Sequence, residues 1–136
     1  MKVVDEFPPN IDEIKQIFPI GSEQPVFAYG DTIYNPYKLP IPDDIIVHEE
    51  VHCRQQKDQP DWWWKKYLVD SEFRKDQEAE AYAAQYNFVR QITNAKLAKE
   101  CLFDLSSGLS GPLYALGIPY YEAETLIRQK SRALKS

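Results

Sequence analysis

Two histidines and a glutamate stand at a spacing that suits metal binding and hydrolysis. His48 and His52 are the only histidines in the chain, and Glu49 directly follows the first. Residues four apart on an α-helix share a face, so both imidazoles can reach one tetrahedral Zn²⁺ ion. Glu49 lies about 100° around the helix, where its carboxylate can take a proton from a water molecule that the metal activates. This HExxH pattern predicts a zinc-dependent hydrolase, and an exposed helix without metal is the plainer alternative.

A catalytic zinc site needs a third protein ligand, because its fourth position is left for water. With no further histidine, this ligand has to be a carboxylate or a thiolate. Cys53 follows His52 directly and points about 100° away from the ligand face. Glu78 is favoured, since Ala81 lies one turn further on the same face and lets two helices approach closely. Glu80 lies about 200° around that helix and is expected to face solvent. The alternative is that both glutamates are ordinary surface charges.

A family resemblance points to the same residues. HExxH followed about 26 residues later by Glu-x-Glu-Ala resembles the gluzincin branch of the zincin metallopeptidases. The resemblance implies His48, His52 and Glu78 as zinc ligands and Glu49 as general base, within a zincin-like fold. Families with this signature often carry Asp or Asn after the alanine, where this chain has Tyr82.

A further side chain is needed opposite the zinc ion, where a hydrogen-bond donor often stabilises the oxyanion. Tyr114, Tyr82 and Arg74 are the candidates. Tyr114 is the first choice, because it follows a segment at 106–112, rich in Gly and Ser, that is predicted to be a loop. A side chain on such a loop can enter a cleft. Half-buried packing is the alternative role for each tyrosine.

The elements that must position these residues form a mostly helical α+β domain over residues 1–136, with a small hairpin or sheet packed on the HExxH helix. Two β-prone runs on either side of Gly30 predict the hairpin, with glycine supplying a positive φ. Asp43 or Asp44 is predicted to cap the HExxH helix. Helical spacing, caps and prolines predict helices at about residues 10–18, 43–57, 61–69, 71–93, 95–102 and 120–134.

Three segments near the motif have predicted roles of their own. The tryptophans at 62–64 cover about 200° of helix surface, so one or two are expected in the core and another at a surface. The hairpin at 26–35 can offer an edge strand to an extended peptide substrate. Residues 54–56 are expected to form a solvated helix end.

Composition and charge narrow the partners and the location. A net charge of −5 and a pI near 5.0 disfavour nucleic-acid binding. No stretch approaches the ~20 apolar residues that a membrane span needs, and the first residues do not form a secretory signal. Cys53 and Cys101 are expected to be reduced thiols. We therefore expect a cytoplasmic protein that acts on a peptide or protein, without nucleic-acid or membrane partners.

Three functions fit these patterns. The first is a zinc-dependent peptidase, and over about residues 32–117 the chain is similar to small peptidases encoded by bacteriophages. The second is a non-catalytic domain that keeps the metal for stability or partner binding, with Asp76 or a cysteine closing the site as a fourth ligand. The third is another amide hydrolase, acting on the peptide crosslinks of a cell wall.

Overall fold

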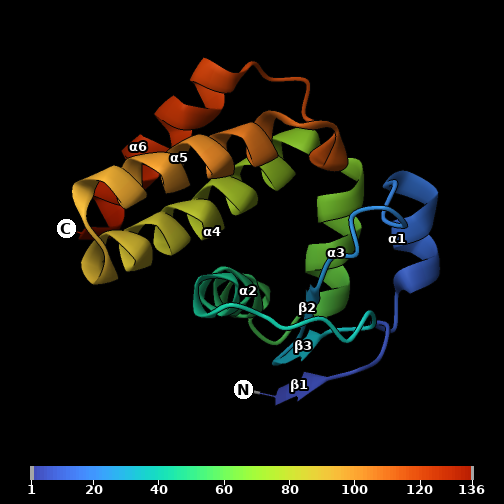
Figure 1. The fold of residues 1–136 in the computed structure, drawn as a ribbon. Helices are drawn as coiled ribbons and strands as arrows, with labels where there is room; N and C mark the ends of the chain where they lie inside the picture. Colours follow the sequence, from blue (N-terminus) through green and yellow to red (C-terminus); the bar gives the residue numbers. More distant parts are fainter. Residues whose placement is uncertain (1, 136) are drawn as a thin grey trace.

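The computed structural model describes residues 2–135, and the side chains of residues 2–134. It confirms a mostly helical α+β fold with a small sheet (Figure 1). The helices are α1 (Ile11–Ile17), α2 (Asp43–Gln56), α3 (Pro60–Val69), α4 (Ser71–Ile92), α5 (Ala95–Ser110) and α6 (Tyr120–Lys135), with a 3₁₀ turn, η1 (Pro112–Tyr114). The strands are β1 (Lys2–Val4), β2 (Phe27–Tyr29) and β3 (Thr32–Tyr34).

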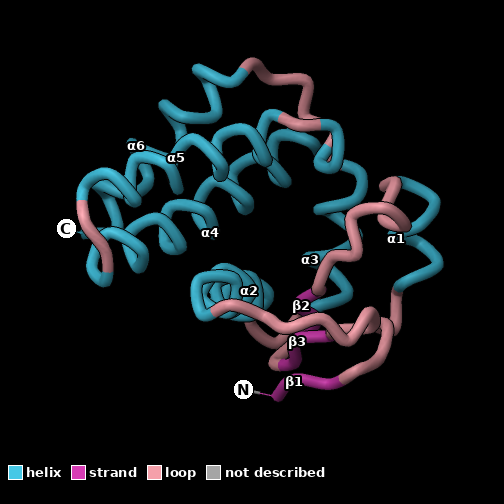
Figure 2. The backbone as a smooth tube through the Cα atoms, viewed as in Figure 1, coloured by secondary structure: helices cyan, strands magenta, loops and turns pink. Residues whose placement is uncertain are grey.

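The small sheet has the order β1-β3-β2, with β1 parallel and β2 antiparallel to β3. The predicted hairpin is confirmed, and Gly30 has a φ of +65° at its turn. β1 was not predicted, because a three-residue strand leaves too little alternation to detect. The strands lie beside α2 and away from α4, α5 and α6 (Figure 2). They are joined to α2 by Gln56, whose side chain accepts from the Gly30 amide and donates to the Ala28 carbonyl.

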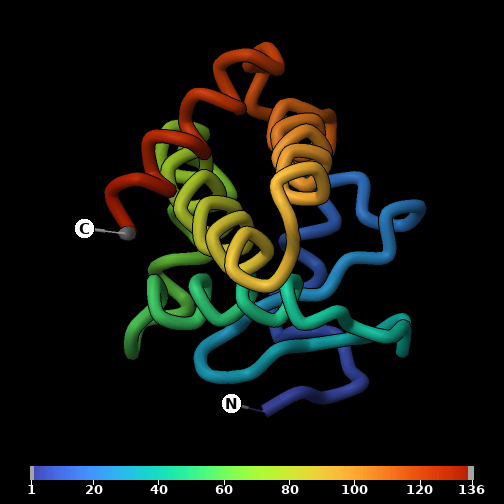
Figure 3. The backbone as a smooth tube through the Cα atoms, turned by 60° about the vertical axis from the view of Figure 1, so that its left-hand side comes forward, coloured from blue at the N-terminus to red at the C-terminus, as the bar shows by residue number. Residues whose placement is uncertain are grey.

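The helices α2 and α4 pack against each other and bring two distant parts of the sequence together. A small side chain favours this approach, because Ala81 on α4 lies one turn after Glu78 on the same face and is fully buried. On another side of α4, the helices α5 and α6 pack against it and against each other (Figure 3). The result is one long helix that serves two packed regions.

Two sequence predictions about these elements are wrong. Residues 106–110 were predicted as loop, but α5 continues through them to Ser110. The reason is a stripe of Leu102, Leu105 and Leu109, which are buried at helical spacing and outweigh the local Gly and Ser content. Neither Asp43 nor Asp44 caps α2, since the N-cap position is Pro42 without a side-chain hydrogen bond. No described helix is both long and apolar enough to cross a bilayer.

Candidate metal centre

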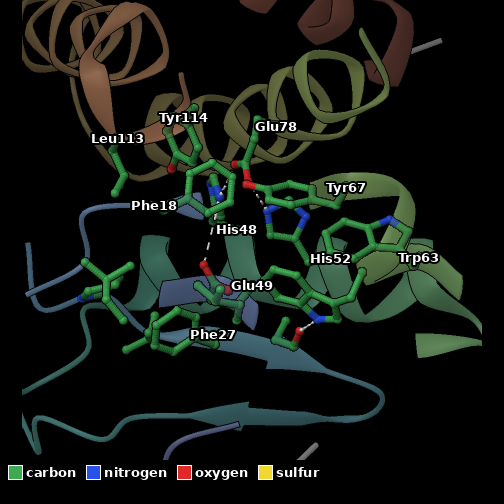
Figure 4. A pocket seen from close by; sticks show the side chains of 16 residues that line it. Phe18, Phe27, His48, Glu49, His52, Trp63, Tyr67, Glu78, Leu113 and Tyr114 are labelled. Carbon is green, nitrogen blue, oxygen red and sulfur yellow. Dashed lines mark hydrogen bonds and ion pairs between the residues drawn. The ribbon is translucent and has the colours of Figure 1, made fainter. Parts of the chain in front are cut away.

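α2 and α4 bring the three predicted ligands together at one point. Nε2 of His48 lies 3.1 Å from Oε1 of Glu78, and Nε2 of His52 lies 3.2 Å from Oε2 of the same carboxylate. One possible ligand atom from each residue lies within 4.8 Å of the others. Ligand atoms about 2.0–2.1 Å from one tetrahedral zinc ion would be about 3.3 Å apart. The group can therefore hold a metal ion with little rearrangement (Figure 4).

The burial of this group also fits a metal. His48 and His52 are each 5% exposed and Glu78 is 3% exposed. Nε2 of His52 is close enough to Glu78 for an ion pair, yet this buried nitrogen has no hydrogen-bond partner in the described chain. Buried polar atoms are nearly always satisfied, so an orphaned imidazole nitrogen facing a carboxylate is what a missing ligand would explain.

Two glutamines fix the orientation of the imidazole rings. Nδ1 of His48 lies 3.0 Å from Oε1 of Gln85, and Nδ1 of His52 lies 2.8 Å from Oε1 of Gln55. An amide oxygen can only accept, so each ring has to donate from Nδ1. In a neutral ring this leaves the lone pair on Nε2, on the side of Glu78, which is the tautomer that a metal requires.

The side chains of both glutamines are held in this orientation by partners of their own. Nε2 of Gln85 donates to Asp44 at 2.8 Å, and Nε2 of Gln55 donates to Glu80 at 2.8 Å and to the Gln77 carbonyl at 3.0 Å. Because these partners accept, the amide oxygen of each glutamine has to face its histidine. Two parallel chains result, His48–Gln85–Asp44 and His52–Gln55–Glu80.

These contacts correct two sequence predictions. Glu80 was expected to face solvent, but it is half-buried and accepts from Gln55. Residues 54–56 were expected to be a solvated helix end, but only Arg54 is exposed, and Gln56 is 2% exposed. The signal that could have found them is that Gln55 lies three residues after His52 and Gln85 lies seven after Glu78, each on the ligand face of its helix.

Glu78 carries a negative charge that its surroundings stabilise. Burial alone would raise the pKa of its carboxyl, but the charge of His52 and the close contacts of both imidazole rings hold that pKa well below its usual range. The Tyr67 hydroxyl donates to its Oε2 at 2.5 Å. A deprotonated, oriented carboxylate is the form that binds a cation.

Glu49 lies beside the ligands and is not one of them. Its Oε2 is 3.9 Å from Nε2 of His48, and the residue is 8% exposed. Burial raises the pKa of the Glu49 carboxyl, His48 and His52 lower it, and Glu78 raises it. The direction is upward, which suits a carboxylate that has to accept and then release a proton.

Tyr114 and Tyr82, the two candidate oxyanion donors, are linked to each other. Their hydroxyls are 2.8 Å apart, and the Tyr82 ring packs edge-on against His48. Burial and the charge of Glu78 raise the pKa of both hydroxyls, so both remain protonated donors. Gly108 on α5 makes room for this pair, since a Cβ there would lie 3.2 Å from the Tyr82 hydroxyl.

Arg74, the third candidate, has a different position. It is buried, and its guanidinium donates to the Tyr114 carbonyl at 2.8 Å and to the Tyr67 carbonyl at 2.6 Å. Arg74 therefore holds the backbone of Tyr67 and Tyr114 in place. This makes Arg74 a positioning residue, so the oxyanion candidates narrow to Tyr82 and Tyr114.

The remaining sequence candidates lie outside the ligand group. Cys53 does not belong to it, and burial raises the pKa of its thiol to about 11. Asp76, considered as a fourth ligand, is exposed and pairs with Lys130. Trp63 and Trp64 are buried whereas Trp62 is 55% exposed, as the helix geometry predicted.

β2 is at one edge of the sheet, but part of that edge is already bonded. The Ala28 carbonyl accepts from Nε2 of Gln56 and from Nε1 of Trp64. An extended peptide cannot donate to this carbonyl without displacing one of these two donors. The prediction that a peptide substrate pairs with the edge strand β2 is therefore limited to the backbone that precedes Ala28.

Comparisons with family models, with curated proteins and with solved structures each find no match to this chain.

Proposed function

We propose that the protein is a zinc-dependent metallopeptidase, with His48, His52 and Glu78 as ligands and Glu49 as general base. The observation that carries this proposal is the convergence of the three buried ligand atoms, with the Glu49 carboxylate beside them. Two imidazole nitrogens and one carboxylate oxygen are a donor set that suits Zn²⁺. The gluzincin resemblance supports the same assignment.

A zinc ion bound here would supply Lewis-acid chemistry, polarising a scissile carbonyl and making water more acidic. Gln55 and Gln85 hold the imidazoles so that Nε2 of each stays directed at the ion. Glu49 takes a proton from the attacking water and passes it to the leaving amide nitrogen. Tyr114 donates a hydrogen bond to the carbonyl oxygen as negative charge develops there, and Tyr82 holds its hydroxyl in place beforehand.

One observation favours a second function, a metal site that only stabilises the fold. All three ligands are almost completely buried, and structural metal sites are closed whereas catalytic ones keep an open position. The cavity that reaches His48 and Glu49 argues for the peptidase, because it provides space beside the ligands. Asp76 and the cysteines, which could have closed the site, lie outside the group.

The test is metal analysis and peptide cleavage by wild type, His48→Ala and Glu49→Gln. We expect one zinc ion per chain in wild type and in Glu49→Gln, and loss of zinc in His48→Ala. Cleavage of a general peptide library should disappear in His48→Ala and fall by about 10²–10⁴-fold in Glu49→Gln. Zinc bound by wild type without any cleavage would favour the stabilising role, and zinc retained by His48→Ala would refute the ligand assignment.

A further inference from the structure

A wide surface groove lies along α4, with α2 and α5 beside it. Both of these helices pack on α4 (Figure 1), and residues of all three line the groove. We name it the α4–α5 groove, after Phe88 and Ile92 of α4 and Glu100 and Asp104 of α5. Its volume is about 550 Å³, and none of the three metal ligands lines it. A cavity of about 150 Å³ accepts one benzene molecule, so the groove has room for several side chains.

The floor of the α4–α5 groove is apolar and partly exposed. Phe88 and Ile92 are four residues apart and share one face of α4, and Leu97 joins them from the first turn of α5. Ile92 and Leu97 are both exposed. Single exposed aliphatic side chains are common on proteins, but here they gather with an aromatic ring in one hollow. An apolar surface that covered this floor would gain binding free energy, because both surfaces leave water.

The rim of the α4–α5 groove is acidic on two sides. Asp43 and Asp44 come from the first turn of α2. Glu100 and Asp104 are four residues apart on one face of α5. No Lys, Arg or His is among the described residues that line the groove, and none of these four carboxylates forms an ion pair within the described chain. The negative charge of the rim is therefore not neutralised by the protein itself.

The thiol of Cys101 shows that acids from both sides act on the same space. Cys101 is half-buried and lines the groove on α5. Burial raises the pKa of this thiol to about 11, and the charges of Asp44 and Asp104 contribute to the rise. A carboxylate of α2 and a carboxylate of α5 thus lie close to one point of the groove. Such a field attracts a cation and repels a nucleic acid or an anionic lipid surface.

The apolar floor favours a peptide segment over a small polar cation, which would leave Ile92 and Leu97 in water. The α5 side of the groove is built from one stripe at helical spacing, which contains Leu97, Glu100 and Asp104. Amphipathic helices bind in such grooves through apolar anchors about one turn apart. Lysine or arginine side chains on either side of those anchors would be placed beside the acids of α2 and of α5.

We propose that the α4–α5 groove binds a basic amphipathic helix of a partner protein, with apolar side chains on the floor and lysine or arginine side chains at both acidic rims. This site goes beyond the proposed peptidase site and needs no metal ion. It shares Asp44 and Gln85 with the hydrogen bonds behind His48. Variants at these two positions would alter both sites, so the test uses residues of α5 and the end of α4.

The test measures the binding of four peptides of about 18 residues, or five helical turns, by fluorescence anisotropy. The first carries leucine on one helical face and lysine on the other. Glutamate replaces every lysine in the second, alanine replaces every leucine in the third, and the fourth is a scrambled order without an apolar face. We expect the first peptide to bind at least tenfold more tightly than each of the others. Equal binding of the alanine peptide would show that any cation suffices and would overturn the proposal.

Binding is measured with and without zinc, and the zinc arm uses Glu49→Gln so that cleavage does not remove the peptide. The Kd of the leucine–lysine peptide should agree within about twofold between the two arms, because the ligands lie outside the groove. Binding that requires zinc would place the peptide at the metal centre and overturn the proposal.

The acidic rim is tested by Glu100→Gln combined with Asp104→Asn. Both residues are exposed, so the fold should be retained. We expect the leucine–lysine peptide to bind about fivefold more weakly, which corresponds to the loss of two exposed ion pairs. Asp5→Asn combined with Glu6→Gln removes the same two charges from exposed residues before α1 and should change the Kd by less than about twofold. Equal losses in both double variants would mean that only net charge matters.

The apolar floor is tested by Ile92→Ser, at the exposed last residue of α4. Loss of this aliphatic contact should weaken binding by about fivefold. Val69→Ser makes a similar change at the exposed last residue of α3 and should leave the Kd unaltered. Circular dichroism checks that each variant keeps its helices. An unchanged Kd in Ile92→Ser would overturn the assignment of the floor.

Amide chemical shifts of the ¹⁵N-labelled chain locate the bound peptide. The largest changes should fall within residues 85–105 and in the first turn of α2, whereas changes centred on residues 20–27 and 112–114 would overturn the proposal. The free chain should sediment as a monomer, and a dimer that Ile92→Ser dissociates would show that a second copy covers the groove instead. Cleavage does not enter these measurements, so their failure would leave the proposed peptidase standing, and failure of the peptidase would leave the groove standing.

Discussion

The two packed regions along α4 bury different kinds of side chain. In the region of α4, α5 and α6, the buried cluster consists of Leu, Ile and Ala residues with Tyr86. In the region where α4 meets α2 and α3, the buried residues include Glu49, Arg74 and Glu78 together with both histidines. These five are the ionisable His, Arg, Glu, Asp and Lys side chains that are buried in the described part of the chain. One helix therefore serves an apolar core on one side and a charged site on another.

The apolar region of α4, α5 and α6 stabilises the fold, whereas the region of α4, α2 and α3 holds the side chains that could perform chemistry. Burying apolar surface lowers the free energy of the folded state, by about 25 cal/mol per Å². Burying a charge raises the free energy of the folded state unless charged or hydrogen-bonding partners offset the lost hydration. Replacing a buried ion pair with apolar residues is therefore often neutral or stabilising. A chain that keeps five ionisable groups in one small region is thus better explained by ligand binding than by stability.

The largest expected effect comes from the apolar region. Leu102→Ala removes a side chain that is 2% exposed in the cluster of α4, α5 and α6. We expect the free energy of unfolding to fall by about 2–5 kcal/mol, measured by urea denaturation. The zinc affinity of the folded variant should equal that of wild type. A large loss of affinity would show that the two regions are not separable.

The next effect comes from the charged region. Gln85→Leu removes the acceptor for Nδ1 of His48 and the donor to Asp44. We expect zinc affinity, measured by competition with a chelator, to fall by about 10–100-fold, since loss of a partner behind a metal-binding histidine has that effect. Gln91→Leu makes the same change at an exposed position of α4 and should leave affinity unaltered. Equal affinities in both variants would mean that Gln85 does not orient the ring.

The smallest effect concerns pH. In the metal-free protein burial lowers the pKa of His52, but the charge of Glu78 outweighs this and raises it to about 9. A raised pKa means that this pair stabilises the metal-free fold fully below about pH 6.5 and that the contribution is lost as pH rises through about 9. Zinc requires the neutral ring, so its binding competes with this proton.

Zinc should therefore stabilise the protein more at pH 9 than at pH 6.5. We expect the zinc-induced increase in Tm to be larger by about 4 °C or more, which corresponds to about 1 kcal/mol for a chain of this size. Stoichiometric zinc is compared with a chelator at each pH by scanning calorimetry. A pH-independent increase in wild type would contradict the pairing of His52 with Glu78.

The sequence predicted the parts of this site that depend on spacing within one helix. His48, Glu49 and His52 follow from the HExxH helix alone, and the small residue at Ala81 favoured Glu78 over Glu80. The partners behind the histidines could not be predicted, because they depend on the register between α2 and α4. Gln55 reaches across to the backbone and side chains of α4, and Gln85 reaches back to Asp44 on α2.

The errors in the fold have a similar physical origin. Ser and Gly residues at 106–110 favour a loop locally, yet burial of Leu109 against α4 and α6 keeps them helical. Asp44 was misassigned as a cap because α2 begins one residue earlier, after Pro42, and its carboxylate instead accepts from Gln85 on α4. Long-range packing decided the conformation of residues 106–110, and a single sequence does not display it.

The assignment of His48, His52 and Glu78 as zinc ligands is tested most directly by X-ray absorption at the zinc edge on the zinc-loaded protein. We expect one ion with two imidazole nitrogens at about 2.0–2.1 Å and oxygen in the remaining positions. Glu78→Gln should weaken zinc binding or alter the oxygen shell, while the two imidazoles remain. A sulfur ligand at about 2.3 Å, or a shell of oxygens without imidazole, would contradict the assignment of His48, His52 and Glu78.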